Sequence, residues 1–239
     1  MLNIYNNNYK NPELLQFLEN KRVILVGPSK SLLHLKNGEF IDSFDVVIRI
    51  NRGIEPVEKY GEFIGHRTDI LYNCLLEHPD NGGIIDIDFL KNNNVKFVCY
   101  HPQVTFNGVA YNRTPFHVSP LTLTKLKSNF KTHMIDFRFY NEITEIVKCR
   151  PNTGNIAIYD ILLHNVKELY ITGFTFYLDG FMSGYKEQTD SKFINNCFNS
   201  KRHDQKQQWS FLKKMKEYDS RIKTDDVLTQ ILQMDELTK

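Results

Sequence analysis

Short apolar runs alternate with polar or amphipathic stretches along most of the chain. Apolar residues between positions 14 and 18 follow a helical spacing and predict a short first helix. Later runs are four to six residues long, which is typical of buried strands, and lie at residues 23–26, 45–50, 68–72, 96–100 and 168–173. Most are followed by helical or polar stretches. This order favours a parallel sheet with helices on both faces.

Three further helices are predicted in the second half of the chain. Residues 156–163 are almost all apolar and predict a buried helix. Another helix is expected to begin at His203, and a last one, capped by Asp225, to run through Leu232.

Residues 105–140 have little periodicity and contain two prolines and several aromatic residues. This segment predicts a small lid-like element or a set of loops over the sheet edge. Its aromatic rings suit a stacking surface for a ligand and ordinary core equally well. We expect residues 1–239 to form one α/β domain, a Rossmann-like parallel sheet with this segment as its lid.

Candidate nucleotide-binding residues lie where the predicted strands end or helices begin. A helix N-terminus offers backbone N–H groups and a favourable dipole to a phosphate. Glycine permits close backbone approach, and the serine, threonine and asparagine residues offer hydrogen bonds to phosphate or ribose. These candidates are Gly27, Ser29, Ser31, Asn51, Asn152, Thr153 and Gly154.

The loop after the strand at 168–173 contains further chemistry. Residues 174–202 lack periodicity and include Tyr177 and Tyr185, and His203 follows directly. Loops at the carboxyl ends of strands bear the functional groups in doubly wound folds. We therefore expect these three side chains to face one crevice.

Composition excludes several classes of protein. The chain has 30 basic and 28 acidic residues, a formal charge of +2, so nucleic acid is not an expected partner. No apolar run approaches the roughly 18 to 20 residues of a membrane helix, and the start lacks the pattern of a signal peptide. We expect a soluble, cytoplasmic protein. Four widely spaced cysteines predict free thiols rather than disulfides or a zinc site: Cys74, Cys99, Cys149 and Cys197.

In their order along residues 23–204, these segments resemble the sialyl motifs of the sialyltransferases, both the animal enzymes and the bacterial enzymes of the same fold. The large motif is matched by Val23 to Leu32 and then by Gly38, Ile41, Asp42, Asp45, Val47, Arg49, Asn51, Phe63, Gly65, Arg67 and Thr68. Pro151 to Gly154 and Glu168 to Phe174 resemble the small motif, and His203-Asp204 the very short motif. Tyr177 and Tyr185 are similar to a tyrosine pair of the bacterial enzymes.

The resemblance implies a sialyltransferase-type variant of the GT-A fold and a glycosyltransferase activity. The enzyme would move a sugar, usually sialic acid, from a CMP-linked donor to an acceptor hydroxyl, with inversion and without a metal or other cofactor. His203 would be the general base, and Tyr177 and Tyr185 would donate hydrogen bonds to the leaving phosphate. Another ulosonic acid would fit the donor equally well. Residues 105–140 would then be a candidate wall for the acceptor sugar. The identity of the acceptor, the linkage and the oligomeric state are left open.

The sequence departs from the family pattern in three respects. Pro28 stands where an asparagine is usual, which removes a side-chain amide and a backbone donor. Gln208 stands where an acidic partner of the histidine is expected, and Val23 and Asn165 replace the cysteines that join the two motifs in animal members.

Other functions share some of these features. A nicotinamide-dependent oxidoreductase has the same strand, glycine turn and helix, but the later glycines of its motif are missing and no acidic residue ends the second strand. A homologue that binds nucleotide or glycan without catalysis is the second alternative, for which Pro28 and Gln208 speak. Asp86-Ile87-Asp88 resembles a metal-binding DxD motif, although a helix cap is favoured. Arg49 is expected to pair with Asp45 or Asp69.

Overall fold

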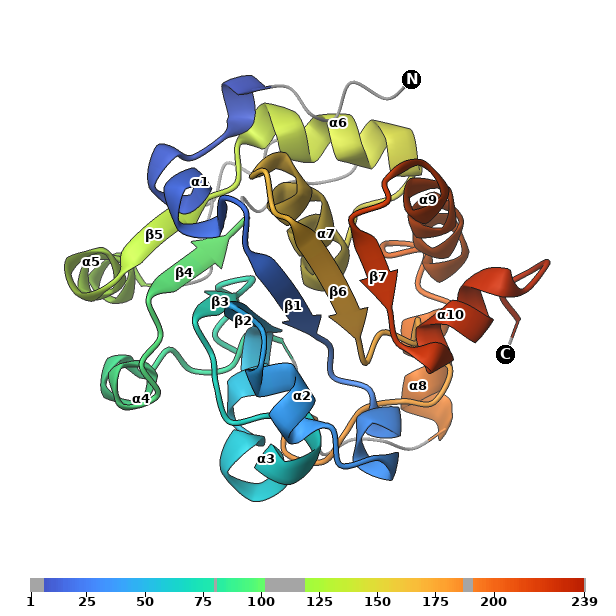
Figure 1. Cartoon of the computed structure of the whole chain (residues 1–239), viewed down its shortest axis with the longest axis horizontal. Coiled ribbons are helices and arrows are strands. Elements are labelled where there is room, and N and C mark those ends of the chain that lie inside the picture. The colour runs from blue at the N-terminus through green and yellow to red at the C-terminus, as the bar shows by residue number, and fades with distance from the viewer. Residues whose placement is uncertain (1–6, 80, 102–118, 187–190, 239) are drawn as a thin grey trace.

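The computed structural model describes residues 7–79, 81–101, 119–186 and 191–238. Within these ranges the centre is one sheet of seven parallel strands in the order β5-β4-β3-β2-β1-β6-β7 (Figure 1). The strands are β1 (Arg22–Val26), β2 (Val46–Ile50), β3 (Ile70–Tyr72), β4 (Phe97–Tyr100), β5 (Lys131–Met134), β6 (Glu168–Thr172) and β7 (Ile222–Thr224). The predicted parallel α/β fold is confirmed.

Helices surround the sheet, and among those of the described ranges none is both long and apolar enough to cross a membrane. The α-helices are α1 (Pro12–Leu18), α2 (Gly38–Asp42), α3 (Val57–Ile64), α4 (Ile87–Asn92), α5 (Pro120–Asn129), α6 (Phe137–Val147), α7 (Thr153–Leu163), α8 (Ser191–Phe198), α9 (Gln205–Tyr218) and α10 (Asp226–Gln233). The 3₁₀ helices are η1 (Asn7–Tyr9), η2 (Lys30–His34) and η3 (Asn51–Ile54).

Alternate residues of β1 belong to opposite hydrophobic layers. Val23 and Leu25 pack with residues of α1, α6, α7, α9 and α10, whereas Ile24 and Val26 pack with residues of η2, α2, α3 and α8. A strand that is covered on both faces needs apolar residues at every position, which explains the continuous apolar run in the sequence. Helices on both faces are therefore confirmed.

Strands β1 and β6 are neighbours in space but distant in sequence. The chain advances from β1 to β5 on one side and then returns to place β6 against the other edge of β1. In open α/β sheets, a reversal of this kind leaves a crevice at the carboxyl ends of the two strands. Helix α7 lies close to this point, and all of its residues are buried, as the apolar run at 156–163 predicts.

The second part of the predicted lid segment belongs to the sheet layer. From Ser119 on, the chain forms α5, β5 and the start of α6, and β5 pairs with β4 at the sheet edge. This corrects the expectation of loops there. Edge strand β5 is partly exposed and has few apolar residues, so it lacks the pattern of a buried strand. Residues 102–118 lie outside the described residues.

The last two long helices begin at acidic caps. Asp204 accepts a hydrogen bond from the Gln207 amide at 3.0 Å, so α9 begins two residues later than expected and His203 precedes it. Asp225 caps α10 as predicted and accepts from the Leu228 amide at 2.7 Å.

Arg49 has a structural role, but not with the predicted partners. Its guanidinium is buried and donates to the carbonyls of Ile64 at 2.7 Å and Gly65 at 2.9 Å. Asp69 instead pairs with Arg67 at 2.8 Å and with Lys96. Carbonyl oxygens at the end of α3 thus take the place of the expected carboxylate.

Candidate functional site

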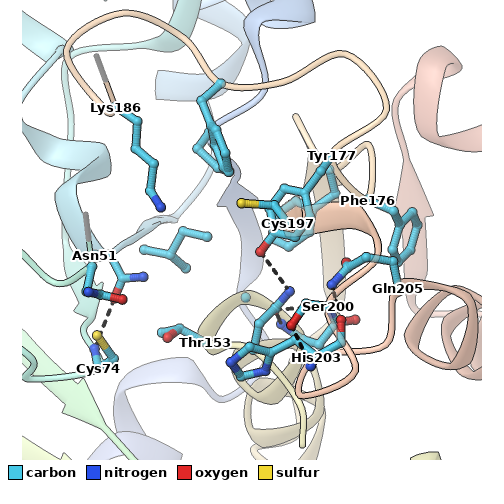
Figure 2. Close-up of a pocket in the computed structure, with 18 of the residues that line it drawn as sticks. Asn51, Cys74, Thr153, Phe176, Tyr177, Lys186, Cys197, Ser200, His203 and Gln205 are labelled. Carbon is cyan, nitrogen blue, oxygen red and sulfur yellow. Dashed lines mark hydrogen bonds between the residues drawn. The ribbon is translucent and has the colours of Figure 1, made fainter. Parts of the chain in front are cut away.

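A pocket of about 380 Å³ opens at the carboxyl edge of the sheet (Figure 2). The ends of five strands and the beginning of α7 contribute to its lining, as expected for a switch-point crevice. Pro28 and Ser29 follow β1, Asn51 follows β2, Cys74 follows β3, His101 follows β4, Phe174 to Tyr177 follow β6, and Pro151 to Asn155 begin α7.

In the turn after β1, the predicted nucleotide-binding residues Ser29 and Ser31 form hydrogen bonds within the protein. Ser29 lines the pocket but is almost fully buried, and its hydroxyl donates to Asp179 at 2.6 Å. The Ser31 amide also donates to Asp179, at 3.0 Å, and the Ser31 hydroxyl lies 2.6 Å from the Ser29 hydroxyl. Neither Ser31 nor Gly27 is among the residues that line the pocket.

Gly27 serves the approach of two strands. A Cβ atom at this position would lie 2.3 Å from the Gly173 carbonyl oxygen. No side chain fits there, because β1 and β6 leave the sheet side by side at this point. Gly27 therefore permits close approach of the Gly173 backbone, whereas the sequence predicted close approach of the nucleotide.

The N-terminus of α7 faces the pocket and is capped as the sequence suggests. The Asn152 side chain accepts from the Asn155 amide at 2.9 Å, and the Asn152 amide donates to Gln208 Oε1 at 2.9 Å. The Thr153 hydroxyl lies 3.4 Å from His101 Nε2. By helix geometry the Thr153 and Gly154 amides have no acceptor within the helix, so this end suits an anion.

Asn51 and Tyr185 meet on one side of the pocket. The Asn51 backbone is left-handed, with φ +47°, and its side-chain oxygen accepts from the Cys74 amide at 3.0 Å. The buried Tyr185 hydroxyl is hydrogen-bonded to the Asn51 side chain. The position of Asn51 at the end of the second strand is as predicted.

Tyr177 lines the pocket beside the beginning of α7. The Asn152 amide group donates to its hydroxyl at 3.4 Å. The Phe181 ring lies between the two tyrosines, 5.1 Å from Tyr177 and 5.6 Å from Tyr185. Burial raises the pKa of both phenols well above the ordinary value. Both remain protonated hydrogen-bond donors over the neutral range.

His203 is fixed by its surroundings in one tautomer. Its Nδ1 lies 2.8 Å from the Arg150 carbonyl oxygen, which can only accept, so Nδ1 holds the proton and Nε2 is the basic nitrogen. Burial lowers the pKa of His203 to about 4. The hydrogen bond to the Arg150 carbonyl raises this pKa in part, and the positive charges of Arg150 and Arg202 lower it further. The imidazole is neutral at pH 7.

Gln208, which stands where an acidic partner of His203 was expected, forms its hydrogen bonds elsewhere. Its side-chain oxygen holds the Asn152 amide instead, and the side chain is fully buried. The Arg150 carbonyl occupies the orienting role at Nδ1.

Sequence reasoning missed the cations of the pocket. Among the described lining residues the charged side chains are Arg150, Lys186 and Arg202, and no carboxylate is present. Figure 2 shows the Lys186 side chain extending toward Asn51. A sequence signal exists for two of them, because Arg150 directly precedes the Pro151 to Gly154 motif and Lys186 directly follows Tyr185. Two of the four cysteines, Cys74 and Cys197, also line the pocket.

The DxD-like segment lies away from this site. Asp86 caps α4 and accepts from the Phe89 amide at 3.0 Å, as favoured from the sequence, and neither Asp86 nor Asp88 lines the pocket.

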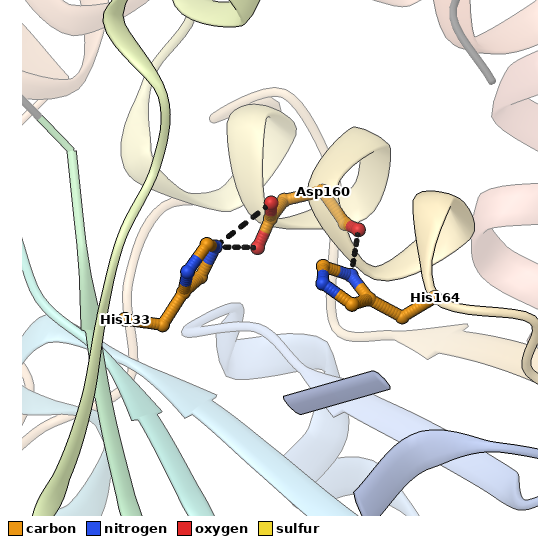
Figure 3. Close-up of side chains that lie close together, drawn as sticks. All are labelled: His133, Asp160 and His164. Atoms are coloured by element: carbon orange, nitrogen blue, oxygen red, sulfur yellow. Dashed lines mark hydrogen bonds and ion pairs between the residues drawn. The ribbon is translucent and has the colours of Figure 1, made fainter. Parts of the chain in front are cut away.

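A buried cluster elsewhere has the residue types of a metal site: His133, Asp160 and His164 (Figure 3). His133 Nε2 lies 3.1 Å from both Asp160 carboxylate oxygens. His164 Nδ1 donates to the Asp160 carbonyl at 2.7 Å, and its Nε2 accepts from the Asn11 amide at 3.2 Å. Since both nitrogens of His164 are engaged, we interpret the cluster as a hydrogen-bonded support for α7.

Comparison with known sequences gives relatives of one kind. Residues 3–75 match the model of Glycosyltransferase family 29 (sialyltransferase). Lactosylceramide alpha-2,3-sialyltransferase of Homo sapiens is 32% identical over 140 residues, covering 59% of this chain and 29% of that protein. The Pan troglodytes protein of the same name is 28% identical over 136 residues, covering 55% of this chain and 36% of that protein. The chain thus spans about a third of the length of these relatives.

Solved structures establish the class of fold. A mammalian sialyltransferase in complex with Gal-beta-1-3GalNAc-ortho-nitrophenol has a TM-score of 0.55 at 18% identity, over 90% of this chain and 73% of that chain. The sialyltransferase CstII from Campylobacter jejuni, in complex with the substrate analogue CMP-3FNeuAc, has a TM-score of 0.50 at 16% identity, over 87% and 88% of the chains. This chain therefore has the α/β fold of the sialyltransferases. The resemblance indicated by its sequence motifs is confirmed.

Proposed function

We propose that this protein is an inverting glycosyltransferase that moves sialic acid, or a related ulosonic acid, from a CMP-sugar to an acceptor hydroxyl without a metal ion. One observation carries the proposal. A neutral His203 with a basic Nε2 shares one pocket with two protonated phenols and the N-terminus of α7. A base and a set of acids across one cavity are what a displacement of nucleotide by a hydroxyl requires.

The charge of the pocket fits the donor. A CMP-linked ulosonic acid bears a phosphodiester charge and a carboxylate charge. The lining offers Arg150, Lys186 and Arg202, together with the amides at the start of α7. The complex of CstII with the substrate analogue CMP-3FNeuAc supports a donor of the same class.

His203 is suited to remove the acceptor proton. Its low pKa keeps the imidazole unprotonated throughout the neutral range, and the hydrogen bond from Nδ1 to the Arg150 carbonyl leaves Nε2 as the basic nitrogen. A hydroxyl activated on the face of the sugar opposite the nucleotide displaces it with inversion. A positioned base of this kind contributes about 10²–10⁴ in rate.

Tyr177 and Tyr185 are suited to stabilise the departing CMP. As the bond to the anomeric carbon breaks, negative charge grows on the phosphate oxygen, and protonated phenols can donate to it. Asn51, Asn152, Thr153 and Gly154 lie beside them as the proposed nucleotide-binding residues.

The other functions fit this pocket less well. An NAD-dependent oxidoreductase needs an acidic group for the ribose, and the described lining contains none. In an NADP-dependent one, Arg52 could meet the 2′-phosphate, but Arg52 pairs with Glu55 at 2.5 Å and is not among the described lining residues. Loss of catalysis was suggested by Pro28 and Gln208. However, the Pro28 carbonyl accepts from the Met182 amide at 2.9 Å, and Gln208 holds α7, so both have structural uses. The cytoplasmic location stays a prediction.

A donor screen tests the proposal directly. The protein is incubated separately with CMP-, UDP- and GDP-sugars, and hydrolysis of each donor is followed by mass spectrometry, while CMP, UMP and NADP are titrated by calorimetry. We expect turnover of CMP-sialic acid or another CMP-ulosonic acid and selective binding of CMP. Turnover of UDP- or GDP-sugars alone, or selective binding of NADP, would overturn it.

A further inference from the structure

Asp179 lies at the centre of the contact between the turn after β1 and the loop after β6. One carboxylate oxygen accepts from the Ser29 hydroxyl at 2.6 Å and from the Ser31 amide at 3.0 Å, both on the first segment. The other accepts from the Thr175 hydroxyl on its own loop. Asp179 itself is only half-buried and does not line the pocket.

The turn that Asp179 closes has an unfavourable backbone. Phe176 and Tyr177 are left-handed, with φ +50° and +65°, and Gly180 has φ +85°. Two consecutive left-handed residues with side chains are strained, and such a turn persists only where its surroundings fix it. The bond from Thr175 to Asp179 spans these residues, as does the bond from the Leu178 amide to the Thr175 carbonyl at 3.0 Å.

The same carboxylate ties this turn to the rest of the crevice. Ser29 and Phe181 form an isolated antiparallel bridge, and the Phe181 ring packs against Tyr177. Through Ser29 and Thr175, Asp179 therefore holds the backbone of Tyr177 at a defined place relative to β1 and to Asn152 on α7.

We propose that Asp179 is a positioning residue, which holds the strained turn at Phe176 and Tyr177 so that the Tyr177 phenol faces the donor phosphate. This rests on the proposed function, since Tyr177 is taken as a leaving-group donor. The carboxylate acts through Tyr177 and not by contact with substrate.

A double-mutant cycle measures this coupling on hydrolysis of CMP-sialic acid. Asp179→Ala should lower kcat roughly tenfold, because small misplacement of a catalytic group is costly, with a smaller change in KM. In a Tyr177→Phe background the same substitution should have almost no further effect on kcat. Asp179→Asn keeps only one of the two acceptor oxygens, so its kcat should lie between those of wild type and Asp179→Ala.

Asp225→Ala is the matched control. Asp225 also accepts three hydrogen bonds near the end of β6, from the Thr172 hydroxyl, the Gly173 amide and the Leu228 amide. It does not itself line the pocket, and none of these partners belongs to the turn at Phe176 and Tyr177. Its loss should lower stability without the effect on kcat. Equal losses of kcat in the two variants, or additive effects of Asp179→Ala and Tyr177→Phe, would overturn the proposal.

A second readout does not depend on turnover. With 3-fluorotyrosine incorporated, the ¹⁹F resonance of Tyr177 is the one that Tyr177→Phe removes. Asp179→Ala should shift this resonance toward the exposed position, while Asp225→Ala leaves it in place. An unmoved resonance sinks the positioning role even if the donor screen succeeds. A moved resonance with no donor turnover sinks the proposed function alone.

Discussion

His203 is held by the Arg150 carbonyl in a neutral form, and this has a consequence for the pH dependence of the rate. A base works only while unprotonated, so activity is lost as the pH falls through its pKa. Since that pKa is lowered to about 4, kcat/KM for donor hydrolysis should stay level from pH 8 down to about pH 5 and fall below it. A fall centred near the ordinary histidine value of about 6.5 would contradict this assignment.

Substitution of the same residue separates chemistry from binding. His203→Ala removes the base but leaves the α7 N-terminus and the phenols in place, so kcat should fall by about 10²–10⁴ while CMP affinity changes little. Steady-state kinetics and calorimetry with CMP check this. Unchanged turnover would remove His203 from the mechanism.

The phenols should affect the rate in another way. Tyr185→Phe leaves the ring against Phe181 but removes the hydroxyl, and a donor that acts mainly in the transition state should affect kcat more than KM, by roughly 10–10². Single-turnover kinetics with CMP-sialic acid measure this. A loss confined to KM would place Tyr185 in ground-state donor binding only.

Several site residues follow from the sequence because their place in the fold does. Asn51 and Tyr177 follow strands, and Asn152 opens an apolar helix, so parallel topology alone brings them to one edge. Gly27 and Ser31 also follow a strand and were predicted to bind the nucleotide. The local sequence does not show that the backbone after β6 packs against Gly27 or that Asp179 accepts from the Ser31 amide.

At the scale of elements, the packing of α7 against the end of β6 is tight enough to test. A Cβ at Gly154 would lie 2.6 Å from the Phe174 ring, whereas a Cβ at Gly53 would meet nothing closer than 3.5 Å. Gly154→Ala should therefore lower the free energy of unfolding by about 1–3 kcal/mol, and the control Gly53→Ala should change it much less. Urea unfolding measures both. Equal effects would show that α7 can shift to make room.

Strands were predictable in proportion to their burial. Strands β1 to β4 are covered on both faces and appear as apolar runs, whereas β5 and β7 at the sheet edges have sequences such as Lys-Thr-His-Met and Ile-Lys-Thr. An edge strand is partly exposed and needs fewer apolar residues, so it lacks the continuous apolar run that identifies a buried strand in the sequence. The edge pairing is decided by tertiary contacts.

Across the fold, the buried cluster of His133, Asp160 and His164, together with Tyr72, joins β3, β5 and α7. Asp160 on α7 accepts from the Tyr72 hydroxyl at 2.7 Å and faces His133 on β5. Burial alone would raise the pKa of the Asp160 carboxyl, but His133, with His164 and Tyr72, outweighs it and lowers that pKa. The carboxylate is therefore stabilised in the folded protein relative to the unfolded chain.

Removal of this carboxylate should destabilise the protein in a pH-dependent way. Asp160→Asn removes the buried charge and one of the two acceptor oxygens that face His133 and Tyr72, and should cost about 1–3 kcal/mol at pH 7. Because the pKa of Asp160 is lower in the folded than in the unfolded state, its carboxylate stabilises the fold fully above the unfolded-state pKa. This stabilisation is lost as the pH falls through the folded-state pKa, so the difference in unfolding free energy between the variant and wild type should narrow below about pH 4. Urea unfolding at several pH values measures it. Glu236→Gln breaks the exposed pair with Lys206 and should cost less than about 1 kcal/mol, and an equal cost would contradict the supporting role.

The distribution of charge over the whole molecule also bears on the metal ion. The chain is nearly neutral, with a formal charge of +2, yet the described pocket lining has Arg150, Lys186 and Arg202 and no carboxylate that could hold a divalent cation. In the proposed reaction these cations would supply, near the donor phosphate, the positive charge that a metal ion supplies in metal-dependent transferases. Donor turnover should accordingly be unchanged after dialysis against EDTA, measured by mass spectrometry of released CMP. Complete loss with rescue by Mn²⁺ or Mg²⁺ would contradict this, and substitution of Asp86 and Asp88 by Asn would then decide whether the DxD-like segment binds the ion.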